Sequence, residues 1–172
     1  MFGRWLKRAS ESPALEGAAE LEREVAAHMS GADAESIRVV TAMAGLLGAV
    51  AYADRNYSQD EEHRVRAELD RVQGLPSRGV EAVCAVLREH VLELSTVQIP
   101  RYCRLLRELG DRELRLEVLA SLVDLAAADG SISSAETNLL RQVTTALGLD
   151  QGDYNAAQAR HRESLDVLRS PE

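Results

Sequence analysis

The chain has 172 residues, of which 45% are hydrophobic and 28% charged, so it can bury the core of a single domain. Its formal net charge at pH 7 is −8, without a long run of one sign, which argues against a nucleic-acid-binding protein because such proteins carry a basic stripe. Cys84 and Cys103 stand alone in helical contexts, as is typical of reduced, buried thiols in a cytosolic protein.

Nearly every segment has the apolar periodicity of a helix, and no window alternates with the period of a strand. The sequence therefore predicts an all-α fold, a compact bundle of about seven or eight helices. In chain order the predicted helices are Ala14–Met29, Ala34–Asp54, Ser58–Gln73, Pro76–Leu94, Arg101–Leu109, Asp111–Ala128, Ser133–Leu147 and Asp150–Arg169.

The longest nearly apolar run covers 15 residues, Val39–Ala53. A membrane-spanning helix needs about 20, so the run is interpreted as a buried core helix. Ala42, Gly45 and Ala49 lie at helical spacing and would let a neighbouring helix approach closely. The opening MFGRWLKR has no apolar stretch typical of a signal peptide. Residues 1–8 could make a weak contact with an anionic membrane surface, but a tail or a docked segment is the favoured interpretation.

Two loops of the sequence resemble each other across an offset of 75 residues. The first reads AYADRNYSQDEE and the second AAADGSISSAET, and the helices on either side align at the same offset. We therefore expect two copies of a helix–loop–helix–helix unit, in halves of about 37–94 and 111–169, joined by the Arg101–Leu109 helix. Residues 1–33 would form an N-terminal tail and first helix, and residues 34–172 the main helical domain.

Each loop ends in the pattern S-x-x-E, formed by Ser58 with Glu61 in the first copy. This pattern is typical of a capping box at a helix N-terminus. The aspartates that open the loops, Asp54 and Asp129, lie near the negative end of a helix dipole. Each therefore needs a partner, which could be backbone N–H groups, an arginine or a cation. An EF-hand is excluded, because setting Gly130 at loop position 6 leaves the first ligand positions without oxygen-bearing side chains.

The pattern A-D-G-x-I-S-x-x-E at a helix–turn–helix resembles the TerB family, which includes tellurite-resistance proteins and the amino-terminal domain of DjlA-type co-chaperones. The resemblance covers about Ile37–Arg169. It implies an all-α bundle with clustered acidic residues suspected of binding divalent cations. By position those acids are Asp54, Glu61, Asp129 and Glu136. The chain has no HPD motif of a J-domain, so it is not expected to be a co-chaperone itself.

Several other residues are interpreted more plainly. Arg55 stands where the second loop has Gly130, and its pairing with a carboxylate would weaken a cation site in the first loop more than in the second. Asp124 is expected to belong to a solvated acidic face together with Glu113 and Glu117. The four histidines are scattered without ligand spacing and are expected at the surface: His28, His63, His90 and His161.

The sequence as a whole predicts a cytoplasmic TerB-like binding or scaffolding module of bacterial tellurite-resistance-type stress systems. A divalent cation of unknown identity at the two loops is the cofactor prediction, and a protein is the expected partner. The rival hypothesis is a metal-dependent hydrolase or metal-sequestering protein using the same acids, and a third is a structural domain without a ligand. No nucleophile–base pair or cofactor-binding glycine motif is evident, so an enzyme is not expected.

Overall fold

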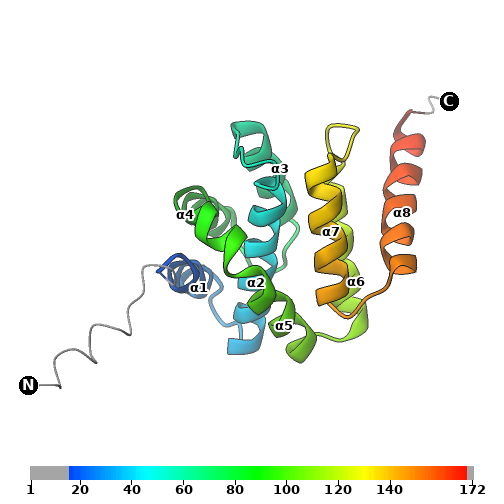
Figure 1. Ribbon diagram of the computed structural model, residues 1–172. Coiled ribbons are helices and arrows are strands. Elements are labelled where there is room, and N and C mark those ends of the chain that lie inside the picture. The colour runs from blue at the N-terminus through cyan, green and yellow to red at the C-terminus, as the bar shows by residue number, and fades with distance from the viewer. Residues whose placement is uncertain (1–15, 170–172) are drawn as a thin grey trace, which may run out of the picture.

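The computed structural model describes the backbone of residues 16–169 and the side chains of residues 16–162. This part of the chain forms eight α-helices and contains no strand, which confirms the predicted all-α bundle (Figure 1). The interpretation of residues 1–8 as a tail or surface contact lies outside the described residues. The helices are α1 (Glu16–His28), α2 (Ala34–Ala51), α3 (Gln59–Leu69), α4 (Ser77–Thr96), α5 (Ile99–Leu109), α6 (Arg112–Ala126), α7 (Ser134–Ala146) and α8 (Gln151–Arg169).

The predicted helix boundaries hold within a few residues, with one difference at α5. The sequence predicts that this helix begins at Arg101, directly after Pro100. The structure instead includes Pro100 in the first turn of α5, which begins at Ile99. A proline is tolerated there because the first N–H groups of a helix have no intrahelical partner.

Helix α2 is the central element of the bundle, and it packs against α1, α3, α4, α5, α6 and α7. It is long and apolar enough by composition to cross a membrane, but 61% of that window is buried inside the protein. The prediction of a buried core helix is therefore confirmed.

Gly45 explains how α5 comes so close to α2. A Cβ atom at this position would collide with the aromatic ring of Tyr102, which is itself 3% exposed. The expected close approach at the small residues of α2 is thus confirmed at Gly45, and its partner is α5.

The two sets of three helices that share the offset of 75 occupy opposite sides of the bundle (Figure 1). Helices α2, α3 and α4 pack on one another, as do α6, α7 and α8. The two sets meet where α2 packs on α6. The middle helix of each set also contacts the first helix of the other set: α3 contacts α6, and α7 contacts α2. The interpretation as an internal repeat stays a prediction.

Both cysteines are free thiols buried in the core, as the sequence indicated. Burial raises the pKa of each thiol to about 11. The two thiols are therefore protonated at neutral pH and are poor nucleophiles.

Candidate functional site

The first loop, residues 52–58, connects α2 to α3. Asp54 Oδ1 accepts a hydrogen bond of 2.9 Å from the backbone N–H of Asn56. At the start of α3, Ser58 Oγ accepts from the N–H of Glu61 at 3.2 Å, and Glu61 Oε2 accepts from the N–H of Ser58 at 2.6 Å. The predicted capping box is therefore present in the first loop.

The second loop, residues 127–133, repeats this arrangement between α6 and α7. Asp129 Oδ1 accepts from the backbone N–H of Ser131 at 3.0 Å. Ser133 and Glu136 form the second capping box, with hydrogen bonds of 2.8 Å and 3.2 Å. In both loops the aspartate therefore finds a partner in a backbone N–H group two residues further on.

The backbone of both loops passes through the left-handed region at the residue after the aspartate. Gly130 has φ 92°, and Arg55 has φ 65°. Apart from glycines, Arg55 is the one residue between 16 and 169 with a positive φ. Its side chain is exposed, so the loop geometry and not a buried contact fixes this conformation.

Tyr57 and Ile132 precede the two capping serines and pack, partly buried, against the hydrophobic core. Their positions are those of hydrophobic staples, which fix the angle at which the chain enters the next helix. Burial raises the pKa of Tyr57 well above its ordinary value, so its hydroxyl stays protonated. The hydroxyl oxygen of Tyr57 is buried and has no hydrogen-bond partner.

The two loops differ in their electrostatics. Partial burial raises the pKa of Glu61, and the nearby negative charge of Asp54 adds to the increase, while the hydrogen bonds from Ser58 oppose it. In the second loop, Asp129 Oδ2 lies 3.8 Å from Nη1 of Arg64, an α3 residue. Arg64 thus forms an ion pair with the aspartate of the second loop, and its positive charge also acts on Glu61 of the first loop, where it partly opposes the increase in pKa.

Arg55 does not pair with a carboxylate among the described residues, and its effect on a cation at the first loop stays a prediction. Arg55 takes part in none of the ion pairs within residues 16–162, and a different arginine, Arg64, acts on the other loop. The physical reason is that Arg55 points to the surface from a left-handed turn, whereas Arg64 extends from α3 across the boundary between the two sets of helices.

The four acids predicted from the resemblance are not gathered into one cluster. Among the described side chains, the group of three ligating residues whose donor atoms all lie within 4.8 Å is Glu20, Glu89 and His90. The loop acids form no such group in this part of the chain. Each loop instead holds one aspartate and one glutamate, and the pair in one loop is separate from the pair in the other.

Two histidines are not simple surface residues, contrary to expectation. His90 has 17% of its side chain exposed and lies 3.1 Å from Glu20 Oε2. His161 has 15% exposed, and its Nδ1 hydrogen-bonds Asp124 Oδ1 at 2.8 Å. Asp124 therefore has a specific partner on α8 and does not belong to a simply solvated acidic face.

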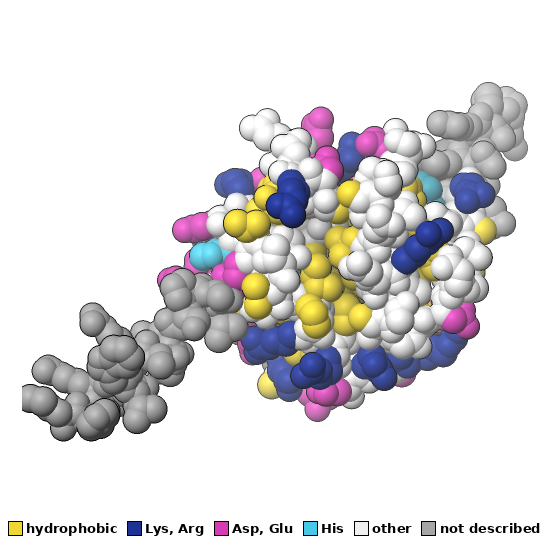
Figure 2. All heavy atoms as spheres, viewed as in Figure 1, with side chains coloured by type: hydrophobic (Ala, Val, Ile, Leu, Met, Phe, Trp, Pro, Cys, Tyr) yellow, Lys and Arg dark blue, Asp and Glu magenta, His cyan; other side chains and the backbone are white. Residues whose placement is uncertain are grey.

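A surface groove runs beside the first loop, where α2, α4 and α7 meet. It has a volume of about 240 Å³. Figure 2 shows apolar side chains exposed in the centre of this face. At the C-terminal end of α4, Leu92 is 58% exposed and Val97, just beyond the helix, is 51% exposed. The groove is lined by Ala49, Tyr52, Ala53, Arg55, Leu92, Ser95, Thr96, Ala135, Asn138, Leu139 and Gln142.

The all-helical bundle with its two capped acidic loops fits a helical module of the tellurite-resistance type, the class that the sequence resembles. The family model described as "Tellurite resistance protein TerB" matches residues 40–159, and the chain belongs to this family. None of the curated proteins and none of the solved structures that were compared gives a match. The matched region includes both loops and every residue that lines the groove, but it excludes α1.

Proposed function

We propose that this TerB module is a cytoplasmic binding or scaffolding domain whose first loop takes a divalent cation. The observation that carries the cation proposal is the pair Asp54 and Glu61. Each is oriented by one hydrogen bond from a backbone N–H group, which engages one carboxylate oxygen and leaves the second for a ligand. Their mutual repulsion helps to raise the pKa of Glu61, and a bound cation would relieve it.

The chemistry of the loop favours a hard cation. Carboxylate oxygens suit Ca²⁺, Mg²⁺ and Mn²⁺. Because two carboxylates supply only part of the six to eight oxygens that Ca²⁺ takes, water would complete the shell and binding would be weak, with a dissociation constant of about 10⁻⁴ M or above. Such a site modulates the loop and does not hold the fold together.

The second loop is the weaker candidate. Arg64 already lies 3.8 Å from Asp129 Oδ2, so a cation would meet a positive charge there. The rival hydrolase or sequestration hypothesis needs acids from both loops to converge on one ion. The separate placement of the four acids argues against that requirement.

The groove supports the scaffolding part of the proposal. Its mixed polar and apolar lining and the exposed Leu92 suit one amphipathic helix of a partner protein, whose apolar face would contact the apolar part of the groove. Arg55 lines the groove, is exposed, and has no ion-pair partner within residues 16–162, so the partner helix should carry a carboxylate facing it. Because Arg55 adjoins Asp54, cation binding at the loop would change the affinity of the groove for its partner.

The cation proposal is tested by thermal melting of the full chain with chelator, Ca²⁺, Mg²⁺ or Mn²⁺. A ligand that binds the folded state at a hundredfold excess over its dissociation constant stabilises it by about 2.7 kcal/mol. We expect one of these ions to raise the melting temperature, Asp54→Asn to abolish the shift and Asp129→Asn to retain most of it. A shift that Asp54→Asn leaves unchanged would overturn the proposal, as would the lack of any shift.

The groove proposal is tested with a displayed library of amphipathic helical peptides. Selection should enrich peptides with apolar residues at helical spacing and an acidic residue beside them. Leu92→Lys should then abolish binding without loss of stability, because Leu92 is 58% exposed. Enriched peptides that bind Leu92→Lys and the unaltered chain equally would place the partner surface elsewhere.

A further inference from the structure

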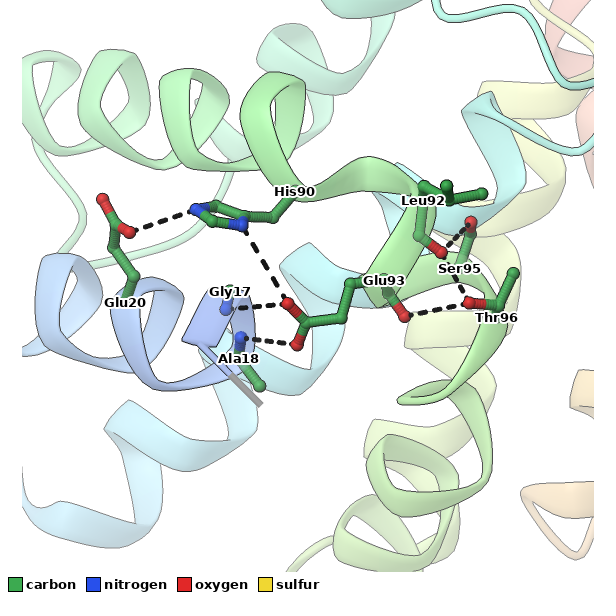
Figure 3. Close-up of polar contacts among 8 residues, drawn as sticks. All are labelled: Gly17, Ala18, Glu20, His90, Leu92, Glu93, Ser95 and Thr96. Atoms are coloured by element: carbon green, nitrogen blue, oxygen red, sulfur yellow. Dashed lines mark hydrogen bonds and ion pairs between the residues drawn. The ribbon is translucent and has the colours of Figure 1, made fainter. Parts of the chain in front are cut away.

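Helices α1 and α4 come close together at Gly17. A Cβ atom at this position would lie 2.5 Å from the Cβ of His90, which is closer than non-bonded atoms come to a real Cβ atom. The absence of a side chain lets the first described turn of α1 sit against α4. The backbone N–H groups of Gly17 and Ala18 then donate to the carboxylate of Glu93, at 2.9 Å and 3.4 Å (Figure 3).

This approach places His90 between two carboxylates. Its Nε2 lies 3.1 Å from Glu20 Oε2 on α1, and its Nδ1 lies 3.9 Å from Glu93 Oε2 (Figure 3). Glu89, the exposed neighbour of His90, supplies a third donor atom. One donor atom from each of Glu20, Glu89 and His90 lies within 4.8 Å of the other two.

The local charge is unbalanced toward the negative. Three carboxylates, those of Glu20, Glu89 and Glu93, surround a single imidazole, so the group is negatively charged even when His90 is protonated. Within residues 16–162, the ion pairs of Glu20 and Glu93 are made with His90 and with no lysine or arginine. A divalent cation would balance this charge.

We propose that Glu20, Glu89 and His90 form a binding site for a divalent transition-metal ion of the Zn²⁺ class. An imidazole nitrogen with two carboxylate oxygens is a donor set that Zn²⁺ accepts, at bond lengths of about 2.0–2.2 Å, with water at the fourth position. The three donor atoms lie within 4.8 Å of one another and would have to draw together around the ion, a movement for which Glu89 is free because its side chain is exposed.

Glu93 gives the proposed site its orienting residue. Histidine ligands of metals commonly present their second ring nitrogen to a carboxylate, which fixes the ring orientation. Glu93 lies on the Nδ1 side of His90 and is itself held by the N–H groups of Gly17 and Ala18. The Nε2 atom is thereby directed at Glu20, and a bound ion would join α1 to α4.

This site is independent of the cation proposed at the first loop. It uses different residues, a nitrogen donor and a softer class of metal. Glu20 also lies outside the region that the family model matches, which begins at residue 40. The site is therefore a property of this chain, formed by packing α1 against the family domain.

The test is a calorimetric titration of the chelator-treated full chain with ZnCl₂, repeated with CoCl₂, whose absorption spectrum reports the coordination. We expect Zn²⁺ to bind, and Glu20→Gln and Glu89→Gln each to weaken binding by about tenfold or more. The matched controls are His63→Gln, at an exposed histidine, and Asp54→Asn in the first loop. Both should keep the affinity within about twofold of the unaltered chain.

Glu89→Gln keeps the test decisive, because this exposed residue can change without disturbing the packing of α1 on α4. Circular dichroism of each variant establishes that the helices are intact. The proposal is overturned if the full chain does not bind Zn²⁺. It is equally overturned if Glu20→Gln and Glu89→Gln bind as tightly as the controls.

Discussion

Arg55 and Gly130 occupy equivalent positions in the two loops, and both have a positive φ, 65° and 92°. For a residue with a Cβ atom the left-handed region costs about 1–2 kcal/mol. A Cβ at Gly130 would meet no atom within 4 Å, so a substitution there changes only the backbone energy. The two loops therefore offer a matched measurement of backbone strain.

We expect Gly130→Ala to lower the free energy of unfolding by about 1 kcal/mol, and Arg55→Gly to raise it by up to about 1 kcal/mol. The opposite signs follow from the same backbone conformation. Urea unfolding of both variants measures the two effects. Destabilisation by both substitutions would show that Arg55 makes a stabilising contact that outweighs its strain.

Glu61 gives the protein a pH dependence of defined sign. Its pKa is raised above the ordinary value of 4.5 in the folded state, chiefly by burial. The folded chain thus holds this proton to higher pH than the unfolded chain does, and stability falls as pH rises from about 4.5 through the folded-state pKa. Glu61→Gln keeps a side-chain acceptor for the capping box and removes this decline.

The measurement is the free energy of unfolding in urea from pH 4 to pH 7, with and without the substitution. As pH rises, we expect the free energy of unfolding of the unaltered chain to fall relative to that of Glu61→Gln. A constant difference across this range would mean that Glu61 titrates alike in the folded and unfolded chains.

At the scale of the helix, the features that could be predicted from the sequence are those that depend on residues close together in the chain. Both capping boxes and most helix boundaries follow from residues within one or two turns of each other. The close approach at Gly45 could be predicted, but its partner α5 could not, because which helix faces a small residue depends on the packing of the whole bundle.

Gly45 and Gly48 provide a matched pair within α2. A Cβ at Gly45 would collide with the ring of Tyr102, whereas a Cβ at Gly48 would lie 3.0 Å from the flexible Cδ2 of Leu87. We expect Gly45→Ala to destabilise the protein by about 2–3 kcal/mol through overpacking. Gly48→Ala should change stability by less than about 1 kcal/mol, because alanine's higher helix propensity offsets the small shift.

Thermal and urea unfolding of the two variants separate these effects. Equal destabilisation by both substitutions would contradict the assignment of the tight contact between α2 and α5 to Gly45.

At the scale of the whole molecule, the sequence could not predict pairs that join distant helices. Arg64 with Asp129, His90 with Glu20, and His161 with Asp124 connect residues whose spacing in the chain follows no local rule. The resemblance identified the four loop acids, but it did not predict that Arg64 forms an ion pair with Asp129 of the second loop.

Arg64 makes this difference testable. Its equivalent 75 residues further on is Leu139, an uncharged residue. Arg64→Gln removes the positive charge from Asp129, and we expect the second loop to gain cation affinity comparable to that of the first. Stability should fall by less than about 1 kcal/mol, because the ion pair is long and partly exposed. Calcium titration of this variant, alone and combined with Asp54→Asn, measures the gain, and no binding by the double variant would contradict it.

The most direct test of the cation proposal is paramagnetic broadening by Mn²⁺ in the amide NMR spectrum of the full chain. We predict that substoichiometric Mn²⁺ broadens the amide signals of Asn56 and Ser58 first, because their N–H groups bond the carboxylates of Asp54 and Glu61. The amides of Ser131 and Ser133 should broaden only at higher Mn²⁺ concentration. Equal broadening at both loops, or broadening at neither, would contradict a cation site in the first loop.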